Sequence, residues 1–372
     1  MGKRAFVIAG EASGDLHGAN LLKELFRMDP DLVVQAWGGD RMRAEGATVM
    51  KHYRELAFMG FTQVLLNLRT ILRNLSLCKA QISAFAPDVL ILIDYPGFNL
   101  RIADWAHAQG IRVVYYISPQ LWAWKENRIA VVKRAVDRMC VILPFEEQWY
   151  AERGVKVDFV GHPLLDEMAS YEAAGGTKNS DHMNAPIALL PGSRAQEISR
   201  MLPVMLRAAK HFPDERFVVA AAPSVPAEVY QRWIREAGDR ARPIEVVTGK
   251  TYALLNEAKA AVVTSGTATL ETALFGVPEV VCYSGSAINV WLARRLINVR
   301  FISLVNLIMD REVVRELVQQ DMNAEAIRAE LDKLLRDVPY RDRMRTDLRS
   351  LREKLGGPGA SARTARLVWK SP

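Results

Sequence analysis

Small hydroxylated residues and a carboxylate are combined in the segment Ser265-Gly266-Thr267-Ala268-Thr269-Leu270-Glu271. The segment follows an apolar run, 260–264, that is typical of a buried strand, and it opens a helical pattern. The first backbone N–H groups of such a helix have no partner within it and bind phosphate. Glu271 lies one turn inside the helix, where it can accept hydrogen bonds from a ribose. The segment therefore predicts a nucleotide site in the second half of the chain.

A second predicted strand, 187–190, ends in Pro191-Gly192-Ser193-Arg194. A helix terminus alone stabilises a bound anion by about 0.3–1 kcal/mol, and by up to about 2 kcal/mol when partly buried. A departing nucleoside diphosphate therefore needs an additional positive charge. Arg194 is the first candidate because its planar guanidinium matches phosphate oxygens. Ser193 offers a further donor, and Arg311 is a second candidate cation.

Asp94 is a candidate general base, because it directly follows the apolar run 89–93 and precedes a Pro-Gly turn. In open parallel sheets, ligands bind at the carboxyl ends of the strands. Partial desolvation at that edge raises the pKa of a carboxyl group and makes it a better proton acceptor. The alternative is that Asp94 only accepts hydrogen bonds within the turn.

The first predicted strand, 4–9, runs into the glycine-containing segment Gly10-Glu11-Ala12-Ser13-Gly14-Asp15-Leu16-His17-Gly18. Its glycine spacing matches neither the dinucleotide fingerprint nor a Walker A loop. Gly10 and Gly14 would let a backbone turn approach a ligand, and the acidic side chains suit a sugar better than a phosphate. The alternative is a tight turn with Asp15 capping the helix, and we expect His17 on the helix surface.

Four aromatic residues accompany another predicted strand end: Tyr115, Tyr116, Trp122 and Trp124. They could flank a sugar ring or an acyl chain. They could equally lie in the core, which is the commoner fate of aromatic side chains.

The composition is that of a globular protein that prefers anionic partners. The chain has 372 residues, half of them hydrophobic, and a formal net charge of +7. It has no dense basic run interleaved with aromatic residues, so we do not expect a nucleic-acid partner. The three cysteines lie far apart in apolar surroundings and predict reduced core thiols. Asp29-Pro30-Asp31 imitates a metal-binding motif but precedes a strand, so we expect a loop, no metal and no cofactor.

Strand-like and helix-like segments alternate along the chain in two series, which predicts an α/β fold with two doubly wound, Rossmann-like domains facing a central cleft. The boundaries are expected at 1–172 for the first domain, 186–345 for the second, and 346–372 for a helical tail that can cross back to the first. From Arg311 onward the pattern is helical and charged. Strands are predicted at 4–9, 32–37, 89–93, 113–117, 139–143 and 157–160, and then at 187–190, 217–221, 244–247, 260–263 and 280–283.

In this order, the landmarks resemble the lipid-A-disaccharide synthase family, which consists of glycosyltransferases of the two-domain GT-B type. The matching segments span nearly the whole chain: GEASGDLHG at 10–18, MGFTQVL at 59–65, PDVLILIDYPGFN at 87–99, ISPQLWAW at 117–124, LPF at 143–145, GHP at 161–163, LPGSR at 190–194, SGTATLE at 265–271, and 303–314. Several are unusual, so their combination is far more specific than any one of them.

The resemblance implies an inverting transfer of 2,3-diacylglucosamine from UDP to the 6-hydroxyl of 2,3-diacylglucosamine 1-phosphate. The products would be a β-1,6 disaccharide 1-phosphate and UDP. The first domain would hold the acyl sugar and the second UDP. The enzyme would require no metal, and it would act at the cytoplasmic face of the inner membrane of a Gram-negative bacterium. In some family members two subunits exchange C-terminal elements, so the resemblance allows a homodimer.

Residue roles also follow from the resemblance. Asp94 would be the base and Glu11, with Gly14 nearby, part of the sugar site. The nucleotide would be held by residues of the second domain: Ser193, Arg194, Ser265, Gly266, Thr267, Glu271, Asn306 and Arg311. The chain departs from the family at Gly97, where many members have Asp, and at Val305 and Arg315, where proline is frequent. It also has Gly38-Gly39-Asp40 before Arg-Met, where members often have Gly-x-Gly-Gly or Ala-Gly-Pro.

The apolar segment 59–75 carries Arg69 and Arg73 one turn apart. Spacing alone favours an ordinary helix packed on a sheet, but apolar helices with basic residues can also lie in a membrane interface. Because both substrates of the family carry acyl chains, the resemblance favours membrane contact. The residues expected to contact lipid are Met59, Phe61, Val64, Leu65, Leu68 and Leu72.

Two other functions are compatible with these motifs. One is a GT-B enzyme that releases a free sugar from a UDP-sugar, such as an epimerase, which would ignore a lipid-like acceptor. The other is a non-catalytic module that binds a nucleotide sugar or a lipid and never releases UDP. An oxidoreductase is disfavoured by the glycine spacing.

Overall fold

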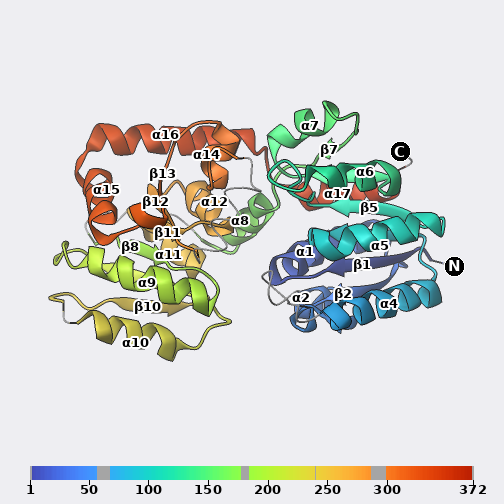
Figure 1. Ribbon diagram of the computed structural model, residues 1–372, viewed down its shortest axis with the longest axis horizontal. Helices are drawn as coiled ribbons and strands as arrows, with labels where there is room; N and C mark the ends of the chain where they lie inside the picture. The colour runs from blue at the N-terminus through green and yellow to red at the C-terminus, as the bar shows by residue number, and fades with distance from the viewer. Residues whose placement is uncertain (1, 57–67, 177–183, 239, 286–298, 371–372) are drawn as a thin grey trace. The chain divides into compact units, whose positions relative to one another are not determined.

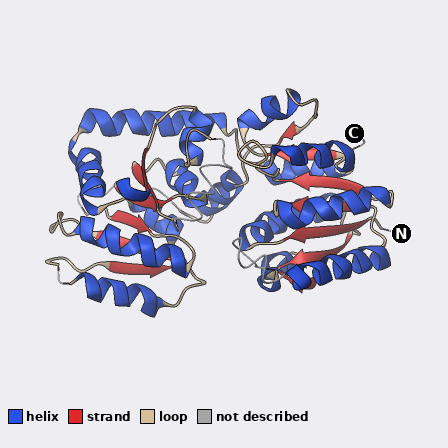
Figure 2. Ribbon diagram, in the orientation of Figure 1, coloured by secondary structure: helices blue, strands red, loops and turns tan. Residues whose placement is uncertain are grey.

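The computed structural model describes residues 2–56, 68–176, 184–238, 240–285 and 299–370. Its contacts divide the chain into two compact units. Unit 1 comprises Met1–Asp166 with Gly357–Pro372, and unit 2 comprises Glu167–Gly356. Each unit is a parallel sheet with helices on both faces (Figures 1 and 2).

Unit 1 is built on a seven-stranded parallel sheet with the order β3-β2-β1-β4-β5-β6-β7. The strands are β1 (Arg4–Ala9), β2 (Val33–Gly38), β3 (Thr48–His52), β4 (Val89–Ile93), β5 (Arg112–Tyr116), β6 (Arg138–Val141) and β7 (Asp158–Phe159). The helices are α1 (Ala12–Met28), α2 (Asp40–Ala44), α4 (Leu68–Phe85), α5 (Pro96–Ala108), α6 (Ile129–Ala135), α7 (Pro144–Ala151) and α17 (Ala360–Val368), with 3-10 turns η1 (Tyr53–Glu55) and η2 (Glu126–Arg128).

Strand β1 shows why the sheet is covered on both sides. Phe6 and Ile8 pack into one hydrophobic core, and Ala5, Val7 and Ala9 pack into a second core on the opposite face. Alternate side chains of a strand point to opposite faces, so a continuous apolar run marks a strand that is buried on both.

The C-terminal helix α17 belongs to unit 1, where it packs against α1 (Figure 1). Its side chains Ala365 and Val368 enter the same core as α1. The Asp166 carboxylate accepts hydrogen bonds from the backbone N–H groups of Gly359, Ala360 (3.1 Å) and Ser361 (2.9 Å). A carboxylate at this position caps the helix and complements its dipole.

Unit 2 is a six-stranded parallel sheet with the order β10-β9-β8-β11-β12-β13. The strands are β8 (Ile187–Leu190), β9 (Phe217–Ala221), β10 (Glu245–Thr248), β11 (Ala260–Thr264), β12 (Glu279–Tyr283) and β13 (Arg315–Val318). Helix α8 (Leu164–Ala173) begins in unit 1 and ends in unit 2. The other helices are α9 (Ala195–Ala209), α10 (Ala227–Ala237), α11 (Thr251–Glu257), α12 (Thr267–Leu274), α14 (Leu304–Met309), α15 (Ala324–Arg336) and α16 (Val338–Lys354), with the 3-10 turn η3 (Gln319–Asp321).

The predicted fold class is confirmed, and every predicted strand is present with ends within two residues. Two edge strands were not predicted. Strand β3 is half exposed and lacks an apolar run, and β13 lies in the region from Arg311 onward that was wrongly predicted to be helical throughout. Edge strands bury little apolar surface, so charged sequences such as Arg315-Glu316-Leu317-Val318 carry only a weak strand pattern. The three cysteines are buried and free, and Asp29-Pro30-Asp31 lies in a loop, as predicted.

Candidate active site

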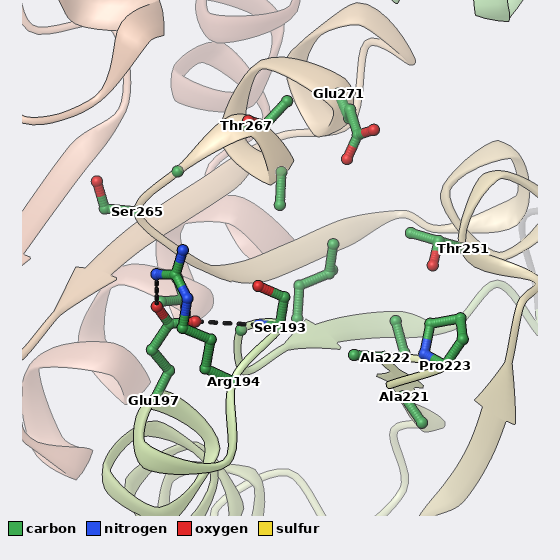
Figure 3. Close-up of a pocket in the computed structure, with 16 residues that line it drawn as sticks. Ser193, Arg194, Glu197, Ala221, Ala222, Pro223, Thr251, Ser265, Thr267 and Glu271 are labelled. Atoms are coloured by element: carbon green, nitrogen blue, oxygen red, sulfur yellow. Dashed lines mark hydrogen bonds and ion pairs between the residues drawn. The ribbon is translucent and has the colours of Figure 1, made fainter. Parts of the chain in front are cut away.

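A cavity of about 390 Å³ opens at the carboxyl ends of β8, β9 and β11, which are neighbours in the sheet of unit 2 (Figure 3). This is the edge at which open parallel sheets bind ligands. The residues predicted for the nucleotide site all line this cavity, except Asn306 and Arg311. It is lined by Leu190, Gly192, Ser193, Arg194, Glu197, Ala220, Ala221, Ala222, Pro223, Thr251, Thr264, Ser265, Gly266, Thr267, Ala268 and Glu271.

Two side-chain hydroxyl groups stabilise the turn from β11 into α12 by hydrogen bonds to backbone carbonyl oxygens. Ser265 Oγ donates to the carbonyl oxygen of Ile302 at 3.2 Å, and the buried Thr269 Oγ1 donates to the carbonyl oxygen of Gly266 at 2.8 Å. Gly266 has φ +152°, a conformation that favours glycine. By helix geometry the first amides of α12, at Thr267 and Ala268, have no partner within the helix, and both residues line the cavity. The turn can therefore bind an anion through its backbone.

Arg194 precedes the first turn of α9 at the end of β8 and is about half exposed. Its Nη1 lies 2.8 Å from Glu197 Oε1, while the Ser193 backbone N–H donates to Glu197 Oε2 at 3.1 Å (Figure 3). An exposed ion pair of this kind contributes about 0–1 kcal/mol to stability, so breaking it to bind a phosphate costs the protein little. Glu197 was not singled out in the sequence, since its role depends on the turn that brings it back to Arg194.

Glu271 lies on the opposite side of the cavity and accepts a hydrogen bond from Tyr252 Oη at 3.1 Å. Burial raises the pKa of the Glu271 carboxyl, the Tyr252 hydroxyl opposes the shift, and the charge of Glu167 adds to it. Tyr252 is itself packed edge-on against Tyr171 and tilted against Phe275. Tyr252, like Glu197, was not predicted, because nothing in the sequence spacing links α11 to α12.

Asn306 and Arg311, which the resemblance places near the ligand, are not among the residues that line this cavity. Asn306 is fully buried, and its amide is used inside unit 2. Its Nδ2 donates to Glu316 and to the Val314 carbonyl, both at 2.9 Å, and its Oδ1 accepts from two backbone N–H groups. The side chain thus joins α14 to β13. Arg311 forms a two-point ion pair with Asp347 of α16, which raises its pKa.

Asp94 directly follows β4 in unit 1 and is only partly exposed. Asp94 and Tyr95 both have left-handed backbones, with φ +46° and +50°. The Asp94 carbonyl oxygen accepts hydrogen bonds from Asn99 Nδ2 at 2.7 Å and from Tyr115 Oη at 2.6 Å. Such conformations are costly in non-glycine residues and cluster at functional sites when the surroundings hold them.

The electrostatic environment of Asp94 suits a proton acceptor. Burial, followed by the negative charge of Glu11, raises the pKa of the Asp94 carboxyl from 3.8 to about 6, and Glu146 adds to the shift. The Tyr95 backbone N–H acts in the opposite direction. A base whose pKa lies just below neutral pH is largely ionised and still binds a proton well.

The segment after β1 differs from the predicted glycine loop. Only Gly10 and Glu11 lie outside α1, and Gly14 and Gly18 are buried within it. A Cβ on Gly14 would lie 3.1 Å from the Ala9 side chain, so Gly14 serves the close approach of helix and strand. The buried Asp15 accepts hydrogen bonds from the backbone N–H groups of Gly39, Arg41 and Met42, and so it caps α2 instead of its own helix.

His17 was expected on the helix surface, but it is buried. Burial lowers the pKa of its imidazole to about 4, and burial together with His17 lowers that of His162 to about 3. Both side chains are therefore neutral at physiological pH. His17 lies close to His162 and Asp166, which are 145 and 149 positions away in sequence and so beyond the reach of helical periodicity.

The four aromatic residues at the end of β5 and after it differ in exposure. Tyr115 and Tyr116 are fully buried, whereas Trp124 is 40% exposed. Trp122 Nε1 donates to the buried carboxylate of Glu146 at 3.2 Å, and Ser118 Oγ donates to the same oxygen at 2.5 Å. Glu146 thus fixes the loop between β5 and α6, a role without a sequence signal.

Most of the expected lipid-contacting segment, including Met59, Phe61, Val64 and Leu65, lies outside the described residues. Leu68 begins α4, and Leu72 on the same helix is 52% exposed. Within the described ranges, no helix is both long and apolar enough to cross a bilayer. Nor does the described part bring three or more His, Cys, Asp or Glu side chains together as a metal site.

Two doubly wound units, with a cavity at the strand ends of one and Asp94 in a left-handed backbone at a strand end of the other, define a GT-B fold. Solved structures agree in fold with TM-scores of 0.66 for the glycotransferase of kitacinnamycin and 0.69 for the S. aureus MnaA–UDP co-structure. The first is 17% identical, covering 99% of this chain and 98% of that one, and the second is 13% identical, covering 100% and 99%.

The chain belongs to the lipid-A-disaccharide synthetase family, whose model matches residues 5–367. Curated relatives named lipid-A-disaccharide synthase come from Syntrophus aciditrophicus and Myxococcus xanthus. Each is 41% identical, over 98% of this chain and 96% of the relative. The resemblance of the sequence motifs is thereby confirmed, and the protein is a glycosyltransferase of lipid A biosynthesis.

Proposed function

We propose that the protein transfers 2,3-diacylglucosamine from UDP to the 6-hydroxyl of 2,3-diacylglucosamine 1-phosphate, with inversion at the anomeric carbon. The products are the β-1,6 disaccharide 1-phosphate and UDP. The observation that carries the proposal is family membership over nearly the full chain, together with a cavity whose polar groups suit a nucleoside diphosphate.

In this proposal the cavity of unit 2 binds UDP. The amides at the start of α12 and the guanidinium of Arg194 bind the diphosphate, and Ser193, Ser265, Gly266 and Thr267 supply further donors. Glu271, oriented by Tyr252, accepts hydrogen bonds from the ribose hydroxyls. These groups stabilise the negative charge that develops on the leaving diphosphate.

Asp94 removes the proton from the acceptor hydroxyl. The bond from the acceptor oxygen to the anomeric carbon forms as the bond to the UDP oxygen breaks, and the electron pair of that bond leaves on UDP. The pKa of Asp94, about 6, keeps most of the carboxylate ionised at neutral pH. Burial and then the charge of Glu11 raise that pKa. Glu11 also contacts the sugar, and Gly14 allows α1 to approach β1 closely beside it. A general base of this kind accelerates the reaction roughly 10²–10⁴-fold.

The cationic charge of Arg194 and the α12 amides take the place of a metal ion, so we propose that the reaction is metal-independent. We further propose that the enzyme works at the cytoplasmic face of the inner membrane of a Gram-negative bacterium, as a peripheral protein. The exposed Leu72 on α4, the apolar segment 59–68 that precedes it and the net charge of +7 support contact with an anionic membrane. A homodimer is compatible with this proposal.

The decisive assay is UDP release from UDP-2,3-diacylglucosamine in detergent, with and without the phosphorylated acceptor. We expect acceptor-dependent release, a β-linked product by NMR and no loss of rate in excess EDTA. Release that ignores the acceptor would indicate an epimerase-like enzyme, and UDP-sugar binding without release would indicate a binding module.

A further inference from the structure

Three cationic side chains, Arg101, Lys125 and Arg128, gather in unit 1 near the exposed indole of Trp124. Lys125 Nζ lies 4.2 Å from the centroid of the Trp124 ring, and Arg128 Cζ lies 5.9 Å from it. Arg101 is on α5, which packs against α6, the helix that follows Arg128. The three side chains come from two separate segments that the fold brings together.

The positive charges of this cluster act on one another. Burial and then the charges of Arg128 and Arg101 lower the pKa of Lys125, and burial and then Arg101 lower the pKa of Arg128. Among the described residues, none of the three has an ion-pair partner. The adjacent carboxylate, Glu126, pairs instead with Arg153 at 2.7 Å. Like charges held together without a counter-charge are unfavourable, and an anion would relieve the repulsion.

The cluster is linked to the proposed base, Asp94, through α5 and Tyr115. Arg101 is on α5, which begins two residues after Asp94. Arg128 is near enough to Tyr115 to act on its phenol, and Tyr115 Oη donates to the Asp94 carbonyl oxygen. Lys125 has a left-handed backbone, φ +56°, at the start of η2, a strained conformation of the kind found at ligand sites.

We propose that Arg101, Lys125 and Arg128 bind the phosphate monoester of the acceptor, and that Trp124 contacts its sugar ring. The inference rests on the proposed function, in which one acceptor molecule presents a hydroxyl to Asp94 and carries a phosphate elsewhere on the same sugar. The donor diphosphate has its own cation, Arg194, in unit 2. The two guanidinium groups give bidentate phosphate contacts, and the indole face suits the apolar face of a sugar.

The test is the double variant Arg101→Gln/Arg128→Gln, assayed in detergent. We expect the KM for 2,3-diacylglucosamine 1-phosphate to rise roughly tenfold or more, since two charge-assisted contacts are lost, while the KM for the UDP-sugar stays unchanged. The same acceptor without its phosphate should be a poor substrate of the unaltered enzyme and equally poor for the variant. Lys133→Gln, which removes an exposed cation from α6, is the matched control and should change neither KM.

Direct binding of glucosamine 1-phosphate, followed by NMR, separates this site from the proposed function. One outcome would support the site and contradict the proposed function. In that outcome the unaltered protein binds glucosamine 1-phosphate, the double variant does not bind it, and neither protein transfers sugar. Unchanged acceptor KM in an active double variant overturns the site alone. Lipid headgroups carry the same phosphate chemistry. A variant with normal acceptor KM but weaker binding to phosphatidylglycerol vesicles would assign the cluster to the membrane and overturn the proposal.

Discussion

Gly10 lies against the ring of Tyr95, so closely that a Cβ at position 10 would be 2.4 Å from the ring carbons. Tyr95 is also held from its other end, where its hydroxyl donates to the Leu56 carbonyl oxygen at 3.1 Å. The end of β1 therefore determines where Tyr95 sits, and Tyr95 forms the left-handed pair with Asp94. The glycine matters here because it leaves space for the ring of Tyr95, the residue next to Asp94.

The first prediction follows from this contact. Gly10→Ala should displace Tyr95 and with it the Asp94 backbone, and we expect kcat to fall roughly 10-fold to 10²-fold, as for misplaced catalytic groups generally. UDP affinity should be unchanged, because the cavity proposed to bind UDP is in unit 2. Gly97→Ala is the matched control, since a Cβ at Gly97 has no neighbour within 4 Å. Equal activity of the two variants would show that the contact is unimportant.

The second prediction concerns pH. The Asp94 carboxyl acts as a base only when ionised, so activity should rise with pH through its pKa of about 6 and be lost below it. Glu11→Gln removes a negative charge that raises this pKa, so the acidic limb of the pH–rate profile should move to lower pH. Glu45→Gln, an exposed carboxylate at the end of α2, should leave the limb in place. A limb that stays put in Glu11→Gln would argue against coupling between the two carboxylates.

The third prediction tests the cation of the nucleotide site. Arg194→Ala should weaken UDP binding about tenfold or more in calorimetry, because a charge-assisted hydrogen bond to a phosphate is lost. Arg200→Ala removes an exposed arginine from the same helix and should leave the affinity unaltered. Identical affinities for both variants would exclude Arg194 from the diphosphate site.

The fourth prediction concerns the C-terminal helix. Asp166→Asn weakens the cap on α17 and should lower the free energy of unfolding by about 0.5–2 kcal/mol. Hydrogen exchange should then be faster in 360–368 and in the covered part of α1. The exposed Asp104, paired with Arg134, provides the control variant Asp104→Asn, whose effect should be small. Unchanged protection in Asp166→Asn would mean that packing alone holds the helix.

Local patterns predicted the strand ends well. The apolar runs before Asp94 and Ser265 placed both residues at the carboxyl edge of a parallel sheet, and Arg194 and Glu271 line the same cavity although 77 positions separate them in sequence. These predictions depend only on a strand, a turn and a helix that follow one another along the chain, together with the rule for where sheets bind ligands.

The other features of the site could not be predicted because they depend on tertiary contacts. Asn306 carries an amide that could bind a ligand, but its role in joining α14 to β13 becomes visible only once β13 is known. His17 is buried close to His162 and Asp166, which are 145 and 149 positions away. Glu146 accepts hydrogen bonds from donors 28 and 24 positions away. No periodicity within a single segment encodes such long-range partners.

The variant Asp94→Asn is the most stringent test of Asp94 as the base. Asparagine tolerates the left-handed backbone and keeps the shape of the side chain, so the fold should be preserved. We expect the rate of transfer from UDP-2,3-diacylglucosamine to the acceptor to fall about 10²-fold or more, with unchanged UDP affinity. Turnover equal to that of the unaltered enzyme would contradict the assignment of Asp94 as the base.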